Sequence, residues 1–326
     1  MAFRVSVPQL GAFDVGEDET IVEAATRHGI AFPFSCHSGT CGTCKSTLVS
    51  GDVTLLDYSK FTLRDEERAA GLILACCAIP KSDCDVRPVT SASPVSAQHT
   101  QCEVASIEHG THDIKILKLT LLRGTPLHFM AGQFADLTFP ELPIRSYSMA
   151  SRPGQPLLEF HVRLTPGGKV SPFVHSHLAV GQTLEFRGPL GSAYLRDDHT
   201  GPIIALAGGS GLGPIKSIVD TLVAKRTTAP IHFYFGVRDE RDLYYAEHFQ
   251  ELEKRFQNLT FTPVLSEPSC ATERRTGFLA DVIKADFQSF AGFKAYLAGP
   301  PVMVETSYAV LESRGLDKAD FHADAF

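Results

Sequence analysis

The sequence predicts a multidomain protein with three modules, and three observations support this. Residues 35–46, "SCHSGTCGTCKS", hold three cysteines among small residues, and residues 101–196 show short alternating strands broken by Gly and Pro. Residues 201–326 alternate strands with helices. The uncharged, Pro- and Ser-rich segment "PVTSASPVSAQHT" is typical of a linker. We therefore predict domains at 1–88, 101–198 and 199–326, with a linker at 89–100.

Size and charge narrow the function classes. The chain has 326 residues, 44% of them hydrophobic, and a net charge of −7, so it can build several cores. No segment is basic, and nucleic acid is therefore not an expected partner. The longest apolar run, roughly "LILACCAI", is far too short to span a bilayer, and we find no export-signal pattern. We expect a cytoplasmic protein that does not bind membranes.

The cysteine-rich loop has a spacing that favours one kind of metal site. In the reducing cytosol, clustered cysteines usually hold metal or do chemistry. Zinc sites typically pair two short C-x2-C elements. The spacing here, Cys36-x4-Cys41-x2-Cys44, is the plant-type [2Fe-2S] spacing, which needs a fourth, distant thiolate.

The segment "GLILACCAIPKSDC" offers three candidates for that fourth ligand. The apolar "LILA" predicts a buried strand that delivers Cys76 to the loop, whereas Cys77 would point to the opposite side. Cys84 has no partner spacing and is expected to be an ordinary small buried side chain. The predicted metal ligands are Cys36, Cys41, Cys44 and Cys76.

The first domain is predicted to be a small sheet crossed by one helix. "TIVEAATRHGI" contains a Thr20-x-x-Glu23 capping box and ends at Gly29. Strands are expected at "AFRVSVPQL" and "KSTLVSGDVTLL". The cysteine loop follows the helix directly.

The middle module is predicted to be an antiparallel barrel or sandwich, because its turn signals are frequent and helical periodicity is almost missing. In an extended "PIRSYSMAS", Arg145 and Tyr147 share one face and Ser148 takes the other. In "TPGGKVSPFV", a glycine turn feeds a predicted helix start, which is an arrangement that binds anions.

These two segments resemble the flavin signature and the FAD pyrophosphate turn of the ferredoxin–NAD(P)H reductase family. The resemblance implies that Tyr147 packs on the isoalloxazine ring, that Ser148 lies near its N5 as a catalytic residue, and that His161 and Arg163 flank the cofactor. Met149 has packing as its alternative role. The FAD-binding residues expected from the resemblance are Arg145, Tyr147, Ser148, Met149, His161, Val162, Arg163, Gly168, Lys169, Val170 and Ser171.

The last module is predicted to be a parallel sheet covered by helices. Strands are expected at "PIIALAG", "PIHFYFG", "LTFTPVL", "FKAYLAG" and "DFHADAF", and the helix "PIKSIVDTLVAKR" follows the first. The turn between them, "AGGSGLGP", suits a pyrophosphate and puts Pro214 at the predicted first helical position. It departs from G-x-G-x-x-G, and no acidic residue follows about 20 residues later as the dinucleotide fingerprint requires.

Both "AGGSGLGP" and "YLAGPPVMV" resemble the nicotinamide domain of the same reductase family. Members often have a cysteine before the Gly-Pro pair, where this chain has Ala298, so we expect no contribution from that thiol. Arg238 and Asp242 are expected near the adenosine ribose; NADH is favoured, although an arginine could also accept the 2′-phosphate of NADPH. The residues expected at NAD(P)H are Gly208, Gly209, Ser210, Gly211, Pro214, Arg238, Asp242, Gly299, Pro300 and Met303.

The chain ends in "HADAF", and terminal aromatic residues in this family can cover the flavin face that nicotinamide must reach. Phe326, with Asp324 two positions earlier, matches this pattern, so both join Ser148 as predicted catalytic residues. The alternative is an aromatic side chain packed into the core.

Together the modules predict electron transfer. NAD(P)H gives a hydride and an iron-sulfur cluster accepts one electron at a time, whereas flavin can do both. A β-grasp [2Fe-2S] ferredoxin domain joined to FAD and NAD domains resembles the reductase components of bacterial Rieske dioxygenases, which implies a Rieske ferredoxin or oxygenase as acceptor. A reductase of a soluble di-iron monooxygenase has the same module order and stays open. A non-catalytic redox sensor is a third reading.

Overall fold

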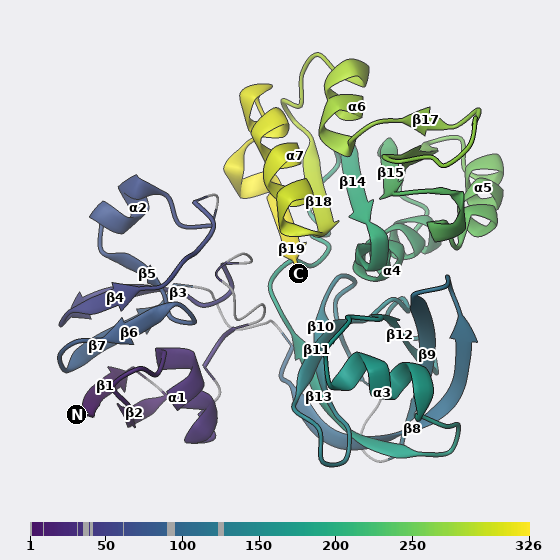
Figure 1. Ribbon diagram of the computed structural model, residues 1–326. Coiled ribbons are helices and arrows are strands. Elements are labelled where there is room, and N and C mark those ends of the chain that lie inside the picture. The colour runs from purple at the N-terminus through teal and green to yellow at the C-terminus, as the bar shows by residue number, and fades with distance from the viewer. Residues whose placement is uncertain are drawn as a thin grey trace. The chain divides into compact units, whose positions relative to one another are not determined.

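The computed structural model describes residues 2–8, 10–30, 32–34, 39, 42–60, 62–89, 95–122 and 127–326. It divides into two compact units, the first comprising Met1–Pro94 with Phe326 and the second Val95–Ala325. The division lies inside the segment 89–100. The barrel and the α/β module therefore form one compact unit (Figure 1).

The first unit is a mixed five-stranded sheet with strand order β2-β1-β7-β3-β5. β1 and β7 pair in parallel, and the other neighbours pair antiparallel. The elements are β1 (Phe3–Val7), β2 (Gly11–Val15), α1 (Ile21–Arg27), β3 (Lys45–Ser50), β4 (Val53–Leu55), α2 (Asp65–Ala69), β5 (Leu72–Leu74), β6 (Ala78–Pro80) and β7 (Cys84–Pro88). This is the β-grasp ferredoxin fold expected from the cysteine spacing.

Helix α1 begins where its sequence predicts. The Glu23 backbone N–H donates to Thr20 Oγ1 at 3.3 Å, and Glu23 Oε2 accepts from the Thr20 backbone N–H at 2.8 Å. Both bonds of the predicted capping box are therefore present. The helix buries Ile21, Val22, Ala24 and Ala25. This burial anchors the helix in the core of the first unit, just before the cysteine loop.

The first half of the second unit is a six-stranded antiparallel sheet, β11-β10-β13-β8-β9-β12. A bridge between Met149 and Phe160 joins its two ends, which closes the sheet into a barrel. The elements are β8 (Gln98–His109), β9 (Ile114–Leu121), β10 (Phe134–Thr138), β11 (Arg145–Ser148), β12 (Leu158–Arg163), α3 (Val170–Ser176) and β13 (Thr183–Leu190).

The second half is a parallel sheet, β17-β16-β15-β14-β18-β19, with helices on its faces (Figure 1). All five predicted strands are present. The elements are β14 (Ile203–Gly208), α4 (Leu212–Ala224), β15 (Ile231–Val237), α5 (Ala246–Arg255), β16 (Leu259–Leu265), β17 (Arg275–Thr276), α6 (Leu279–Asp286), β18 (Lys294–Gly299), α7 (Pro301–Ser313) and β19 (Phe321–Ala325), with short 3-10 turns η1 (Gly209–Gly211), η2 (Glu240–Asp242) and η3 (Lys318–Asp320).

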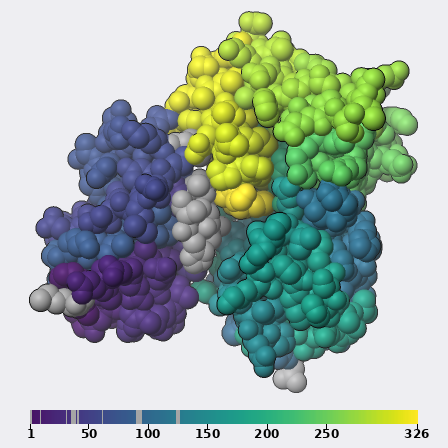
Figure 2. Space-filling view, viewed as in Figure 1, coloured from purple at the N-terminus to yellow at the C-terminus, as the bar shows by residue number. Residues whose placement is uncertain are grey.

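The two halves of the second unit share a hydrophobic core. Ile114 and Ile116 of the barrel pack in one cluster with Ile215 and Ile218 of α4 and with Tyr244. In Figure 2 the barrel and the α/β half form one continuous body of atoms. Strand β9 and helix α4 therefore pack in one hydrophobic core.

Candidate functional site

Two of the four predicted metal ligands lie together in the first unit. Cys44, just before β3, and Cys76, in the turn after β5, are both buried, and their sulfurs are 3.2 Å apart. Neither forms a disulfide. Cys36 and Cys41 lie outside the described residues.

The predicted orientation of the Cys77 side chain is wrong. Strand β5 ends at Leu74, so strand alternation does not extend to Cys76 and Cys77. In the turn the two sulfurs lie 3.6 Å apart on the same side. The Cys77 sulfur is also close to Gly39 of the cysteine loop, where an added Cβ would come within 2.8 Å of it.

The predicted flavin strand β11 connects to the end of the chain. Ser148 Oγ donates a hydrogen bond to Asp324 Oδ2 on β19 at 3.1 Å. Tyr147 packs against the barrel core, and burial raises the pKa of its phenol to about 12. Arg145 is exposed, which leaves its guanidinium accessible to an anion, and Phe326 is 51% exposed. The alternative of a terminal aromatic buried in the core is therefore wrong.

The predicted pyrophosphate turn is held by its own hydrogen bonds. The backbone N–H of Gly168 donates to the Thr165 carbonyl at 3.0 Å, and the backbone N–H of Thr165 donates to Ser171 Oγ at 2.9 Å. Lys169 is exposed, whereas Val170 is 2% exposed and packs in the barrel core. Val170 can therefore offer a ligand only its backbone.

The two glycine turns of the α/β half pack main chain against main chain. A Cβ at Gly211 would lie 2.1 Å from the Ala298 carbonyl oxygen, a contact that no side chain can make. Gly299 has φ +142°, and a Cβ there would lie 2.8 Å from the Gly208 carbonyl oxygen. These glycines bring β14 and β18 together at their carboxyl ends, where ligands bind in open α/β sheets.

Pro214 is not the first helical residue. Helix α4 begins at Leu212, directly after η1, so Pro214 is its third residue. It still belongs to the first turn, where backbone N–H groups have no partner within the helix and a missing one costs little.

A pocket of about 240 Å³ opens beside these turns. Seven of the predicted nucleotide or flavin residues line it: Arg163, Gly208, Gly209, Arg238, Asp242, Pro300 and Met303. Phe278 and Val302, which are 65% and 67% exposed, also line it. Arg163 was predicted to flank the flavin, and the structure places it at this pocket.

Charges at the pocket are paired. Asp113 Oδ2 lies 3.1 Å from Arg163 Nε and 3.5 Å from Arg238 Nη2, and Arg238 Nε donates to Asp242 Oδ2 at 3.2 Å. Burial alone would raise the pKa of Asp113, but a hydrogen bond from Thr111 and the Arg163 guanidinium lower it. Arg238 thus lies between two carboxylates.

Three residues predicted on the flavin strands have buried side chains. Met149 and Val162 are each 0% exposed in the barrel core. His161 is 6% exposed, and its ring nitrogens lie 3.0 Å from Glu159 Oε1 and 3.0 Å from the Tyr244 hydroxyl. Its ring therefore faces the α/β half.

Comparison with known proteins identifies the chain. Family models match along most of its length: a 2Fe-2S iron-sulfur cluster binding domain at 8–81, an oxidoreductase FAD-binding domain at 101–194 and an oxidoreductase NAD-binding domain at 205–308. The reductase component of the naphthalene 1,2-dioxygenase/salicylate 5-hydroxylase systems of Ralstonia sp. is 38% identical, over 94% of this chain and 93% of that protein. The chain belongs to the ferredoxin–NAD(P)H reductase family.

Two further relatives are also reductases. The phenol 2-monooxygenase reductase component from Pseudomonas sp. (strain CF600) is 35% identical over 100% of this chain and 95% of its own. The crystal structure of an Amycolatopsis cytochrome P450 reductase superposes with a TM-score of 0.77 at 35% identity, covering 99% of this chain and 98% of the other.

The reductase is an NAD(P)H-dependent flavin iron-sulfur oxidoreductase, with domains for [2Fe-2S], FAD and NAD. Within the part of the chain that the structure describes, no helix has the length and apolar character needed to cross a membrane.

Sequence reasoning missed the side chains that join the two halves of the second unit. Lys216 and Tyr245 contact Glu159 of β12. One signal was available: a lysine in the largely apolar helix "PIKSIVDTLV" needs a partner if that helix is buried.

Proposed function

We propose that this reductase passes electrons from NADH through FAD and a [2Fe-2S] cluster to a Rieske ferredoxin, or directly to a Rieske oxygenase that hydroxylates an aromatic substrate. The observation that carries this proposal is the 38% identity, along nearly the whole chain, to a reductase component of naphthalene dioxygenase and salicylate hydroxylase systems. We also propose that it acts in the cytoplasm, with domains at 1–88, 101–198 and 199–326.

The described thiols fit a cluster. Cys44 and Cys76 are reduced, buried and 3.2 Å apart, and thiolate sulfur is the ligand that iron-sulfur clusters take. We propose that Cys36 and Cys41 complete the ligand set.

The barrel residues fit a flavin. Arg145 and Lys169 are exposed cations, and Lys169 belongs to a turn that hydrogen bonds hold, which suits a pyrophosphate. Tyr147 would pack along the ring system, and Ser148, held by Asp324, would face its reactive edge. When bound, FAD converts a two-electron hydride into single electrons. The protein's part is to hold donor and acceptor in line and to keep water out.

The pocket favours NADH. A 2′-phosphate would approach Arg238, whose charge is already compensated by Asp113 and Asp242. Two nearby carboxylates repel an additional dianion, whereas a ribose 2′-hydroxyl can donate to a carboxylate. We therefore propose NADH as the physiological donor.

A second acceptor class has a specific observation in its favour. The phenol 2-monooxygenase reductase component is 35% identical across this entire chain. We therefore keep the reductase of a di-iron monooxygenase as the second candidate.

An anaerobic visible spectrum before and after stoichiometric NADH tests the electron path. Bleaching of flavin and cluster bands, with about two irons per chain, is expected. Reduced protein is then mixed with a Rieske ferredoxin and, separately, with a di-iron hydroxylase. Faster oxidation by the Rieske protein supports the first proposal, and faster oxidation by the hydroxylase overturns it in favour of the second.

A further inference from the structure

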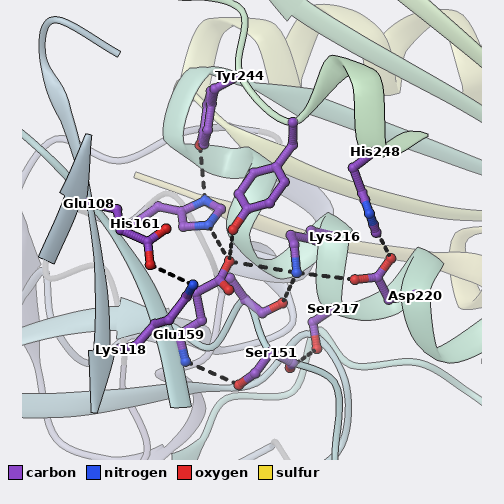
Figure 3. A network of polar contacts seen from close by, with 12 residues as sticks. Glu108, Lys118, Ser151, Glu159, His161, Lys216, Ser217, Asp220, Tyr244 and His248 are labelled. Carbon is purple, nitrogen blue, oxygen red and sulfur yellow. Dashed lines mark hydrogen bonds and ion pairs between the residues drawn. The ribbon is translucent and has the colours of Figure 1, made fainter. Parts of the chain in front are cut away.

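A buried carboxylate joins the two halves of the second unit (Figure 3). Glu159 Oε1, on β12 of the barrel, accepts from the Tyr245 hydroxyl at 2.9 Å and lies 3.0 Å from His161 Nε2. Lys216 Nζ, on α4, lies 3.6 Å from the same oxygen. One barrel oxygen therefore contacts both α4 and the segment that precedes α5.

Buried charges of opposite sign lie close together in this cluster. The side chains of Glu159 and Lys216 are 10% and 7% exposed, and Lys216 Nζ also lies 3.1 Å from Asp220 Oδ2. Burial would raise the pKa of Glu159, but the hydrogen bond from His161 and the charge of Lys216 lower it to about 2. Removing one member of such a pair costs far more than an exposed pair contributes, because the other charge stays buried.

His161 extends the cluster to the nucleotide turn. Because Glu159 is a carboxylate, His161 Nε2 carries the hydrogen, and burial lowers the pKa of the ring and keeps it neutral. Nδ1 then accepts from the Tyr244 hydroxyl at 3.0 Å, and the same hydroxyl lies 3.4 Å from the Gly209 carbonyl oxygen. The Tyr244 side chain therefore lies between strand β12 and the turn that follows β14, and its one hydroxyl hydrogen is directed at His161.

Tyr245, whose hydroxyl binds Glu159, has an unfavourable backbone conformation. Its φ of +57° and ψ of +11° lie in the left-handed region, which costs a non-glycine residue about 1 kcal/mol or more. In this conformation its ring stacks on His161, with centroids 5.7 Å apart, and lies under Lys216 Nζ at 5.0 Å. Backbone strain of this kind persists where the surrounding contacts hold the residue in the strained conformation.

Helix α4 also holds the chain just after the predicted flavin strand. Ser217 Oγ donates to the Ser151 carbonyl at 2.7 Å, and Lys216 Nζ donates to the Ala150 carbonyl at 3.4 Å. Those carbonyls come two and three residues after Ser148. The same helix begins directly at the nucleotide turn.

We propose that Glu159, His161, Lys216, Tyr244 and Tyr245 form a latch of positioning residues, which fixes the nucleotide turn against the flavin strand in the geometry that hydride transfer needs. The inference rests on the proposed function, because it assigns the latch to the step from NADH to FAD. The rate of hydride transfer is sensitive to small displacements of the donor relative to the acceptor. Loosening the latch therefore slows the reduction of FAD more than it weakens the binding of NADH.

The test is anaerobic stopped-flow reduction of the holoprotein by NADH, with the Tyr245→Phe and Glu159→Gln variants. Tyr245→Phe removes one hydroxyl and keeps the ring. We expect the limiting rate of flavin reduction to fall about tenfold, with a smaller change in the NADH concentration for half-maximal rate and an unchanged flavin potential. Deuterium at the transferred C4 position should slow the variants at least as much as the wild type.

Glu108→Gln is the matched control. Glu108 Oε1 lies 2.7 Å from Lys118 Nζ, an ion pair within the barrel that Figure 3 shows near the latch. This variant should reduce at the wild-type rate.

Three outcomes decide the matter. Slower reduction in Tyr245→Phe with full FAD content supports the latch. Wild-type limiting rates in both variants, or rates lowered only in proportion to lost FAD, overturn it while the proposed function stands. Wild-type protein that NADH fails to reduce overturns the proposed function and the latch together.

Discussion

Ser148 and Asp324 are 176 positions apart in the sequence, and their side chains share a hydrogen bond of 3.1 Å. The bond joins barrel strand β11 to the last strand of the parallel sheet. Asp324 is 9% exposed and is paired with Ala298 across β18 and β19. The end of the chain is therefore part of the predicted flavin site.

Replacing Ser148 with Ala should slow flavin reduction by NADH about three- to tenfold, because one hydrogen bond contributes about 0.5–1.5 kcal/mol. Stopped-flow reduction measures this. Ser146→Ala is the matched control, since Ser146 Oγ, on the same strand, donates to Asp136 Oδ1 at 2.7 Å. Equal effects of the two substitutions would contradict a special role for Ser148.

Gly211→Ala should raise the KM for NADH and lower the free energy of unfolding by about 1–3 kcal/mol, because the new Cβ meets backbone that cannot yield easily. Gly213→Ala tests the same region without the clash, since its Cβ would be 3.5 Å from the nearest atom. Thermal unfolding and steady-state kinetics measure the stability and the KM for NADH of the two variants. A tolerated Gly211→Ala would refute the main-chain packing of the turns.

Asp113→Asn should shift preference toward NADPH about fivefold, corresponding to about 1 kcal/mol. The substitution removes one carboxylate beside Arg238 and keeps the side chain's size. The ratio of kcat/KM for the two donors measures the effect. Asp239→Asn is the control, because that carboxylate is bound to Ser269, and it should leave the ratio unchanged. An unchanged ratio in Asp113→Asn would argue against charge as the cause of the preference for NADH.

Burial beside Arg196 and Lys294 lowers the pKa of His322 from 6.5 to about 4. The folded state therefore favours the neutral ring. The free energy of unfolding is not reduced by this residue above pH 6.5, and it falls as the pH drops from 6.5 toward 4. The slope approaches about 1.4 kcal/mol per pH unit from this residue.

His322→Phe keeps an aromatic ring against Tyr296 and should flatten this dependence. The temperature of flavin release, followed by fluorescence between pH 7.5 and 5.5, reports it. His99→Gln, at a largely exposed side chain, should behave like the wild type. An identical pH dependence in His322→Phe would show that another group is responsible.

Cys76→Ser should remove the cluster, whereas Cys77→Ser should keep about two irons per chain. The sulfurs are only 3.6 Å apart, so proximity alone does not separate them. Cys76 is also 3.2 Å from the Cys44 sulfur. Iron content and the visible spectrum discriminate, and loss of iron in Cys77→Ser alone would reverse the assignment.

Local patterns predicted much of this molecule. The capping box of Thr20 and Glu23 and the five parallel strands depend on neighbours in sequence, and all are present. Predictions failed where a boundary shifted by a few residues: β5 ends at Leu74, so alternation could not place Cys77, and η1 displaces Pro214 within α4.

Contacts between distant segments were beyond the sequence alone. Arg163 and His161 were both expected near the flavin, because the resemblance to the reductase family implies that they flank the cofactor. Their actual partners, Asp113 for one and Tyr244 for the other, come from different elements. No local sequence pattern predicts such contacts between side chains of distant segments.

The contact between the two glycine turns limits how this enzyme can change its electron donor. Where Gly211 meets Ala298 and Gly299 meets Gly208, the turns beside the pocket pack peptide groups against each other, and substitutions change side chains rather than peptide groups. Variation is left to the rim, at Asp113, Arg238, Phe278 and Val302. Engineering of nucleotide preference should therefore start at the rim and leave the glycine turns unchanged.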